Sequence, residues 1–192
     1  MPHKQRTSDV GSWHFSENKE LYEIQRGNNF EFIIDKNLDG INAYGSDVKT
    51  FPNAREYIRL SVSSAFIPHY RQQAIEVRRG NTAVKYAGTM SWDNGQIQCY
   101  DFIGAEVKDI LMAWQAQAGN PKYQTVGQQA DYKRDATLVE YPPDYSGVVR
   151  TWRLQGCWIS SISEEPMNQN NGNNARNISC TIEYDRAYVD YE

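Results

Sequence analysis

The residue types that most often carry catalysis or bind metals are few in this chain, and their spacing fits no known site. The three histidines are isolated, without the i, i+4 or cysteine-partnered spacing of a zinc site. The three cysteines form no Cys-x-x-Cys pair, so we expect small buried side chains in a chain made in a reducing compartment. These residues are His3, His14, His69, Cys99, Cys157 and Cys180. We predict neither a metal site nor a redox site.

Motifs of nucleophilic catalysis and of phosphate binding are also missing from the sequence. A reactive serine needs a base within reach, and no Gly-x-Ser-x-Gly turn marks a candidate. No glycine-rich loop of the phosphate-binding kinds is present. Glu164 and Glu165 are adjacent, so on a strand they would point to opposite faces and form no acid–base pair. We therefore expect a protein that is not an enzyme and uses no cofactor. A hydrolase with an unrecognised site stays open as an alternative.

The overall charge is mildly acidic, at −4, from 24 acidic and 20 basic residues. A protein that grips nucleic acid through many phosphates needs a basic surface, so this balance argues against such a role. It leaves open a protein past which DNA slides. The sequence has no apolar run near the roughly 18 residues of a membrane helix. No apolar segment follows the first residues, so we expect no secretory signal either.

Strand patterns dominate the chain after a polar N-terminal arm at 1–27. Alternating apolar residues and turn signals predict strands at 28–35, 57–63, 74–79, 83–90, 96–102, 131–141, 147–160 and 176–188. The pair Asn94-Gly95 predicts a hairpin between the strands on either side of it. In the seventh strand, Trp152, Leu154 and Trp158 share one parity, so we expect them on one face.

One helix is predicted, over 104–118. Apolar residues recur there at the spacing of one helix face, and Gly119 is expected to end the helix in a left-handed conformation. The residues of that face are Val107, Ile110, Leu111 and Trp114. Many strands with one helix inserted about two-thirds along predict a mostly β or α+β domain, namely a small antiparallel barrel or sandwich with one flanking helix.

Three stretches, taken in their order and spacing, resemble the tail-tube proteins of contractile-tailed bacteriophages. The stretch 84–119 joins Val-Lys-Tyr-Ala-Gly and Trp-Asp to a helix that ends Met-Ala-Trp-Gln-Ala-Gln-Ala-Gly. The stretch 130–141 resembles the strand that follows the helix loop in that family. The stretch 152–191 resembles its closing hairpin, with Leu-Gln-Gly-Cys-Trp early and Ile-Glu-Tyr-Asp-Arg-Ala-Tyr late. The arm at 1–27 and the extra residues at about 35–57 depart from the family.

The resemblance implies a tail-tube domain over 28–192, a structural virion protein whose hexameric rings stack into the inner tail tube through which DNA is ejected. Implied partners are further copies of the chain, the tail sheath protein, the tape-measure protein and transiting DNA in the lumen, and baseplate and tail-terminator proteins. The implied location is the virion tail, after assembly in the host cytoplasm. Tube initiators, terminators, inner-baseplate proteins and bacteriocin or secretion tubes share the fold and stay open as alternatives.

Candidate interface residues are charged and lie in two sets. A basic set between Arg55 and Lys85 includes Arg78 and Arg79, and an acidic set near the C-terminus includes Asp185 and Asp190. Opposite patches on one chain suit head-to-tail contact between subunits. A solvated sheet face is the other interpretation of the basic set.

The segment 35–57 supplies the remaining candidates, Ile41, Tyr44 and Phe51. It is polar and rich in turn residues, yet it holds these three apolar anchors, which a free loop would not need. We expect it to project from the barrel toward the next ring or the sheath, so that deleting 38–52 leaves the domain folded. An Asn-rich loop at 164–175, together with many aromatic residues, also leaves a carbohydrate-binding β-domain open.

Overall fold

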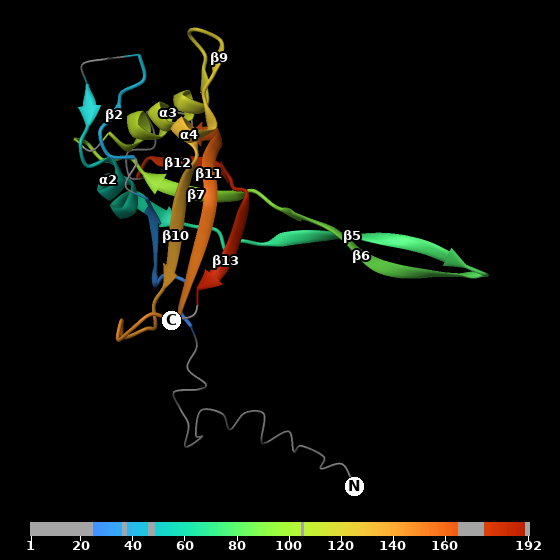
Figure 1. Cartoon of the computed structure of the whole chain (residues 1–192). Coiled ribbons are helices and arrows are strands. Elements are labelled where there is room, and N and C mark those ends of the chain that lie inside the picture. Colours follow the sequence, from blue (N-terminus) through green and yellow to red (C-terminus); the bar gives the residue numbers. More distant parts are fainter. Residues whose placement is uncertain (1–24, 36–37, 46–48, 105, 165–174, 191–192) are drawn as a thin grey trace.

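The fold is known here from a computed structural model. It describes residues 25–35, 38–45, 49–104, 106–164 and 175–190. The N-terminal arm predicted at 1–27 and the loop predicted at 164–175 lie almost wholly outside these residues. The described part confirms a mostly β fold, with a curled antiparallel sheet at its centre (Figure 1).

The main sheet has seven strands in the order β1-β10-β11-β12-β7-β4, with β13 also paired to β11. Its strands are β1 (Phe30–Ile34), β4 (Val62–Ser64), β7 (Gly95–Tyr100), β10 (Arg134–Glu140), β11 (Arg150–Glu164), β12 (Asn177–Glu183) and β13 (Arg186–Asp190). Three two-stranded sheets are β2 (Ile41–Asn42) with β3 (Thr50–Phe51), β5 (Tyr70–Arg79) with β6 (Thr82–Trp92), and β8 (Gly119–Asn120) with β9 (Thr125–Val126). The helices are α2 (Ala54–Ser61), α3 (Val107–Ala118) and α4 (Gln129–Tyr132). Among the described residues, none of these helices is both long and apolar enough to cross a lipid bilayer.

Strand β11 holds the two halves of the curled sheet together. Its first half pairs with β10 and β13, and its second half pairs with β12. Gly156 lies between the halves at a φ of 70°, which favours glycine, and an added side chain would run into the Asp185 carboxylate. The resulting bulge shifts the alternation, so that Leu154 and Ile159 are buried. The expectation that Leu154 and Trp158 share a face was therefore wrong.

Helix α3 confirms the predicted helix and its buried face. Val107, Ile110, Leu111 and Trp114 are buried, and the helix packs against β11. The Trp114 side chain is 1% exposed, and its Nε1 donates a hydrogen bond to the Tyr132 carbonyl oxygen at 2.8 Å. Gly119 ends the helix in an extended conformation, with φ at −153°, and not in the expected left-handed one.

The strand predicted at 57–63 is wrong, because most of it forms helix α2. Ala54, Ile58 and Ser61 are buried at i, i+4 and i+7, the spacing of a helix face. The apparent alternation came from Leu60, which is 62% exposed and does not face the core. The helix packs against β1. The fold therefore has more than the single helix that was expected.

The hairpin predicted at Asn94-Gly95 is also wrong. Strand β6 ends just before this pair and β7 begins at Gly95, but β6 pairs with β5 while β7 pairs with β12 and β4. A side chain at position 95 would run into the ring of Phe66, so glycine is required there by close packing and not by a tight turn.

Described residues of the segment 35–57 contribute side chains to the domain core. Leu38, Ile41 and Phe51 are 0%, 6% and 5% exposed, and β2 packs against α3. Deleting 38–52 would take these three side chains out of the core. The expectation that such a deletion leaves the domain folded no longer holds.

Candidate assembly surface

A long hairpin, Tyr70–Trp92, projects away from the rest of the domain (Figure 1). We call it the arm, and the remaining described residues the body. Every residue of β5 is exposed, as are most residues of β6. The two strands pair with each other and with no further strand of the described part. A two-stranded hairpin that packs on no other element has little stability of its own, so contacts at its root and a covering surface would both stabilise the arm.

The two faces of the arm differ in chemistry. Ile75 pairs with Tyr86 and Val77 with Val84, which gives one face four large apolar side chains. These side chains are 39% to 55% exposed. The other face holds the ion pair between Lys85 Nζ and Glu76 Oε1, at 3.2 Å. A contiguous apolar stripe on a projecting element is typical of a protein–protein contact surface.

Unpaired strand edges occur on the body as well. In the described part, β1 pairs only with β10, and β13 pairs only with β11. Both long edges of the arm are also free of strand partners there. Open edges expose unpaired backbone donors and acceptors, which a strand of another chain can pair with.

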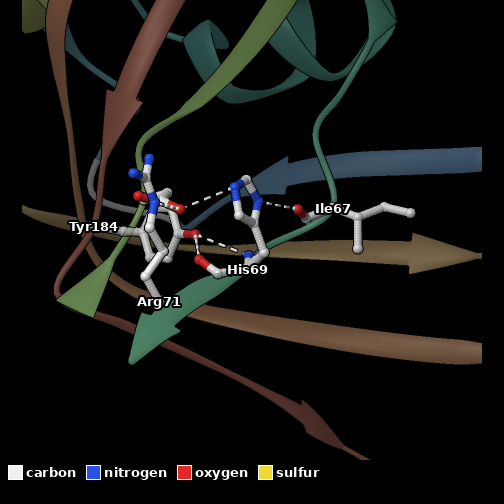
Figure 2. Close-up of polar contacts among 5 residues, drawn as sticks. Ile67, His69, Arg71 and Tyr184 are labelled. Atoms are coloured by element: carbon white, nitrogen blue, oxygen red, sulfur yellow. Dashed lines mark hydrogen bonds and ion pairs between the residues drawn. The ribbon is translucent and has the colours of Figure 1, made fainter. Parts of the chain in front are cut away.

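The arm joins the body at a cluster of four polar residues, His69, Arg71, Asp93 and Tyr184, which we call the elbow. Figure 2 labels three of them, His69, Arg71 and Tyr184. Arg71 Nε donates to the Asp93 carboxylate at 2.7 Å, and His69 Nε2 lies 3.2 Å from the same carboxylate. The Tyr184 hydroxyl lies 3.3 Å from both the backbone nitrogen and the carbonyl oxygen of His69. The backbone nitrogen of Asp93 donates to that carbonyl oxygen at 3.2 Å. The two strands are thus tied to each other and to the body at one point.

Aromatic rings pack beside the elbow. Tyr70 and Trp92 are the first and last residues of the arm and lie at its root. Their rings meet edge to face, with centroids 5.2 Å apart. Trp92 lies 5.8 Å from the Tyr184 ring, which stacks on Phe66 at 5.6 Å. Such ring pairs add stability beyond the area they bury, so the root of the arm is the part best anchored to the body.

The charges of the elbow favour an ionised Asp93. The hydrogen bond from Arg71, and then the charges of Arg71 and His69, hold the pKa of Asp93 below its usual value. The other ring nitrogen of His69, Nδ1, lies 3.4 Å from the Ile67 carbonyl oxygen. Both groups facing this ring are acceptors, so a proton on either ring nitrogen has a hydrogen-bond partner.

The predicted charged residues lie in different parts of the structure. Arg78 and Arg79 are exposed near the tip of the arm. Asp185 accepts from Lys133 Nζ at 2.7 Å, and Asp190 lies 3.3 Å from Arg153 Nε, so both acids have basic partners within their own chain. The remaining basic residues of the set do not share one sheet face, because Arg55 and Arg59 lie on α2. Their role in contacts between subunits stays a prediction.

The three apolar anchors of 35–57 are also separated by the fold. Ile41 and Phe51 are buried in the body, whereas Tyr44 is 36% exposed. Tyr44 lines a groove of about 400 Å³ beside α3, together with Met112 and Trp158. Tyr44 is therefore the one of the three whose side chain is open to a neighbour without rearrangement.

The described ranges hold no candidate metal site, and their cysteines are buried. No group of three or more His, Cys, Asp or Glu side chains there is arranged to hold a metal ion. Cys99, Cys157 and Cys180 are free thiols and are buried, as expected. Burial raises the pKa of the Cys99 thiol to about 11.

No protein-family model matches the sequence. The chain is 22% identical over 106 residues to tail tube protein gp19 of Enterobacteria phage T4, and equally to that of Enterobacteria phage T6. Each match spans 55% of this chain and 65% of the phage protein, which is just under two thirds of its length.

Solved structures of contractile injection systems share the fold over most of the chain. A chain of the PVC sheath–tube complex in the extended state matches with a TM-score of 0.63 and 14% identity, covering 92% of this chain and 99% of that one. A chain of the PVC sheath/tube terminator matches with a TM-score of 0.60 and 17% identity, covering 88% and 98%. At sequence identities this low, the structural similarity establishes a shared fold and nothing more.

The protein thus has the fold of the tubes of contractile tails and injection systems. Within that class, its sequence similarity is to phage tail tube protein gp19.

Proposed function

We propose that this chain is a structural subunit of the tube of a contractile phage tail and not an enzyme. Its hexameric rings stack into the channel through which DNA is ejected. The resemblance of three stretches to tail-tube proteins, the sequence similarity to gp19 and the shared fold support this role. The virion tail is then its place, and the host cytoplasm its place of assembly.

The observation that carries this proposal is the arm. A soluble monomer gains nothing from a two-stranded projection with four exposed apolar side chains on one face. A second copy that covers this face removes the apolar area from water and supplies the missing contacts. Because the arm extends from one side of the body, it reaches a neighbour and does not cover its own domain (Figure 1).

The further partners follow from the same role. The sheath, terminator and baseplate proteins are proposed neighbours, in keeping with the complexes in which this fold occurs. The tape-measure protein and the transiting DNA are proposed to occupy the lumen. A subunit with more acidic than basic residues suits a channel that must not hold phosphates.

A tube-end protein is the second candidate function. A cap of the anti-feeding prophage tube shares the fold, with a TM-score of 0.61, 15% identity and coverage of 88% of this chain and 93% of that one. A main tube subunit polymerises into long tubes, whereas a cap or terminator forms single rings. Negative-stain electron microscopy of the concentrated protein separates the two.

A matched pair of substitutions tests the arm's role in assembly. Val84 lies on the apolar face and Ala83 on the opposite face, and both are exposed. We expect Val84→Asp to abolish rings and tubes, because a carboxylate would be buried without a partner in the contact. Ala83→Asp adds the same charge one residue away and should assemble like the parent protein.

Circular dichroism should show the folded body in both variants, since the altered residues lie outside it. Equal assembly of the two variants would contradict an interface on the apolar face. Dispersed monomers from the parent protein at every concentration would contradict the tube role itself.

A further inference from the structure

The arm is long, so a small rotation at its root displaces its tip by a large distance. Strand β5 has 10 residues, and at ~3.3 Å per residue the arm reaches about 30 Å. Over that length, a swing of about 10° at the root moves the tip by about 5 Å, roughly the spacing between neighbouring strands. An arm that is free to swing would rarely meet a neighbouring subunit in the correct register. A subunit that holds this direction before binding would pair more readily with its neighbour.

We propose that the elbow is a positioning device that fixes the direction in which the arm leaves the body before any partner is bound. This inference rests on the proposed function only for its purpose, which is to present the arm to another copy of the chain. The fixed direction itself is a property of a single subunit. Pre-ordering a contact segment reduces the entropy lost on association, which is how the elbow favours assembly.

The Asp93 carboxylate is the centre of the elbow. It follows β6 directly and accepts from Arg71 on β5, so it ties the two roots of the arm together. It also faces His69, the residue before β5. The Asp93 side chain is 17% exposed, against 77% for Arg71 and 64% for His69. The carboxylate is therefore the least exposed of the three groups, and the exposed side chains of Arg71 and His69 both contact it.

The Tyr184 hydroxyl connects this unit to the main sheet. Tyr184 directly follows β12, and its ring is buried against Phe66. Its hydroxyl meets the His69 backbone at both nitrogen and carbonyl oxygen, so it holds the chain where the arm begins (Figure 2). Tyr184→Phe removes that link and keeps the ring, whereas Asp93→Asn removes the charge and keeps the side-chain shape.

Distance measurements between two spin labels test the proposal on unassembled subunits. One label is placed on the arm tip through Asn81→Cys and the other on the rigid strand β7 through Gln96→Cys, both at exposed positions. The three native cysteines are buried, and a mock-labelled parent protein checks that they stay unmodified. The matched control is Glu76→Gln, which makes the same charge change within the arm and breaks its pair with Lys85. Pulsed electron paramagnetic resonance on the dilute monomer fraction gives the distribution of distances between the two labels.

We expect one narrow distribution for the parent and for Glu76→Gln, and a broadened or shifted distribution for Asp93→Asn and Tyr184→Phe. The same position and width of the distribution in all four proteins would overturn the proposal, as would a broad distribution in the parent. The monomers are compared by circular dichroism, so that unfolding is recognised as such. Failure of the parent to form tubes would contradict the proposed function and leave the distance result standing.

Discussion

The side chain of Trp114 shows how much one residue contributes to the body. It is 1% exposed and its indole nitrogen donates to the Tyr132 carbonyl, so it links α3 to α4 as well as filling the core. Arg134 lies over its ring, with the guanidinium carbon 5.9 Å from the centroid. Both the apolar area and the hydrogen bond are lost when the side chain is truncated.

We expect Trp114→Ala to lower the free energy of unfolding by about 3–5 kcal/mol, the usual cost of removing a large buried aromatic side chain. Urea unfolding in the assembly-deficient Val84→Asp background isolates the effect on the subunit. Val126→Ala is the control, because Val126 is 87% exposed and its truncation should have an effect within about 0.5 kcal/mol. A loss below about 1 kcal/mol for Trp114→Ala would reject its role in the core.

Asp93 gives the elbow a dependence on pH. Because the Arg71 hydrogen bond lowers the pKa of Asp93 in the folded protein, folding is favoured while this carboxylate is ionised. Its contribution is fully present above the unfolded value of 3.8 and is lost as the pH falls through the lower folded value. The parent and Asp93→Asn should therefore differ in urea midpoint at pH 6 and converge in strong acid. An unchanged difference across that range would show that Asp93 does not stabilise through its charge.

At the scale of elements, the bend in β11 sets the shape of the sheet. Gly156 is held at a positive φ, and its backbone nitrogen donates to an Asp135 carboxylate oxygen at 3.1 Å. The bulge lets one strand serve both halves of the curled sheet. An alanine at this position meets both an unfavourable backbone conformation and the Asp185 carboxylate.

Gly156→Ala should destabilise the subunit by about 1–3 kcal/mol, the cost of a residue held in a sparsely populated backbone region. Gly147→Ala is the matched control, since an added methyl group there has open space. Thermal unfolding of both variants in the Val84→Asp background gives the comparison. Equal melting temperatures would mean that the bend adjusts to a side chain.

Elements with one clear period were predicted well, and those with two competing periods were not. The buried face of α3 keeps the helical spacing over four apolar residues. In β12, Ile178, Cys180 and Ile182 are buried at every second position, in agreement with their alternation in the sequence. Helix α2 was missed because Ile58, Leu60 and Val62 also fit the period of a strand. The bend at Gly156 changed the parity of β11, and the isolated glycine within the strand pattern was the local signal of this bulge.

The arm was predicted as two strands, and its residues Arg78 and Arg79 were candidate interface residues, but its apolar face was not recognised as a candidate site. Its apolar residues alternate in the same way as those of a strand packed on a core. Whether a hairpin lies on the body or projects from it depends on distant contacts at its root, such as those of Tyr184 with His69. These two residues are 115 apart in the sequence, so local periodicity carries no information about them.

At the scale of the whole molecule, the charge balance bears on what a tube of these subunits does with DNA. The surplus of acidic residues is small, with 24 against 20. Arg78 and Arg79 are exposed basic residues near the tip of the arm, and such side chains bind phosphates. Every charge that faces a lumen is repeated once per subunit in a ring, so we predict that these arginines face another subunit or the outside.

We expect assembled tubes to bind duplex DNA more weakly than micromolar at about 50 mM salt, with little further loss at about 200 mM. Binding by Lys and Arg to phosphates releases counterions and falls steeply over that range. Fluorescence anisotropy of labelled duplex with tubes and with Val84→Asp monomers is the measurement. Tight binding that collapses with salt would favour a ring that grips DNA over a sliding channel.

Where each arm reaches a copy in the next ring, the one-sided placement of the arm gives the stack of rings a polarity. An arm that inserts into a different surface of the next copy makes a heterologous contact, which does not close on itself as a symmetric dimer does. One end of the growing polymer then carries unoccupied arms, and the other end carries unoccupied receiving surfaces. The two ends differ chemically, so growth proceeds by a different reaction at each, and each end needs a different protein to stop it.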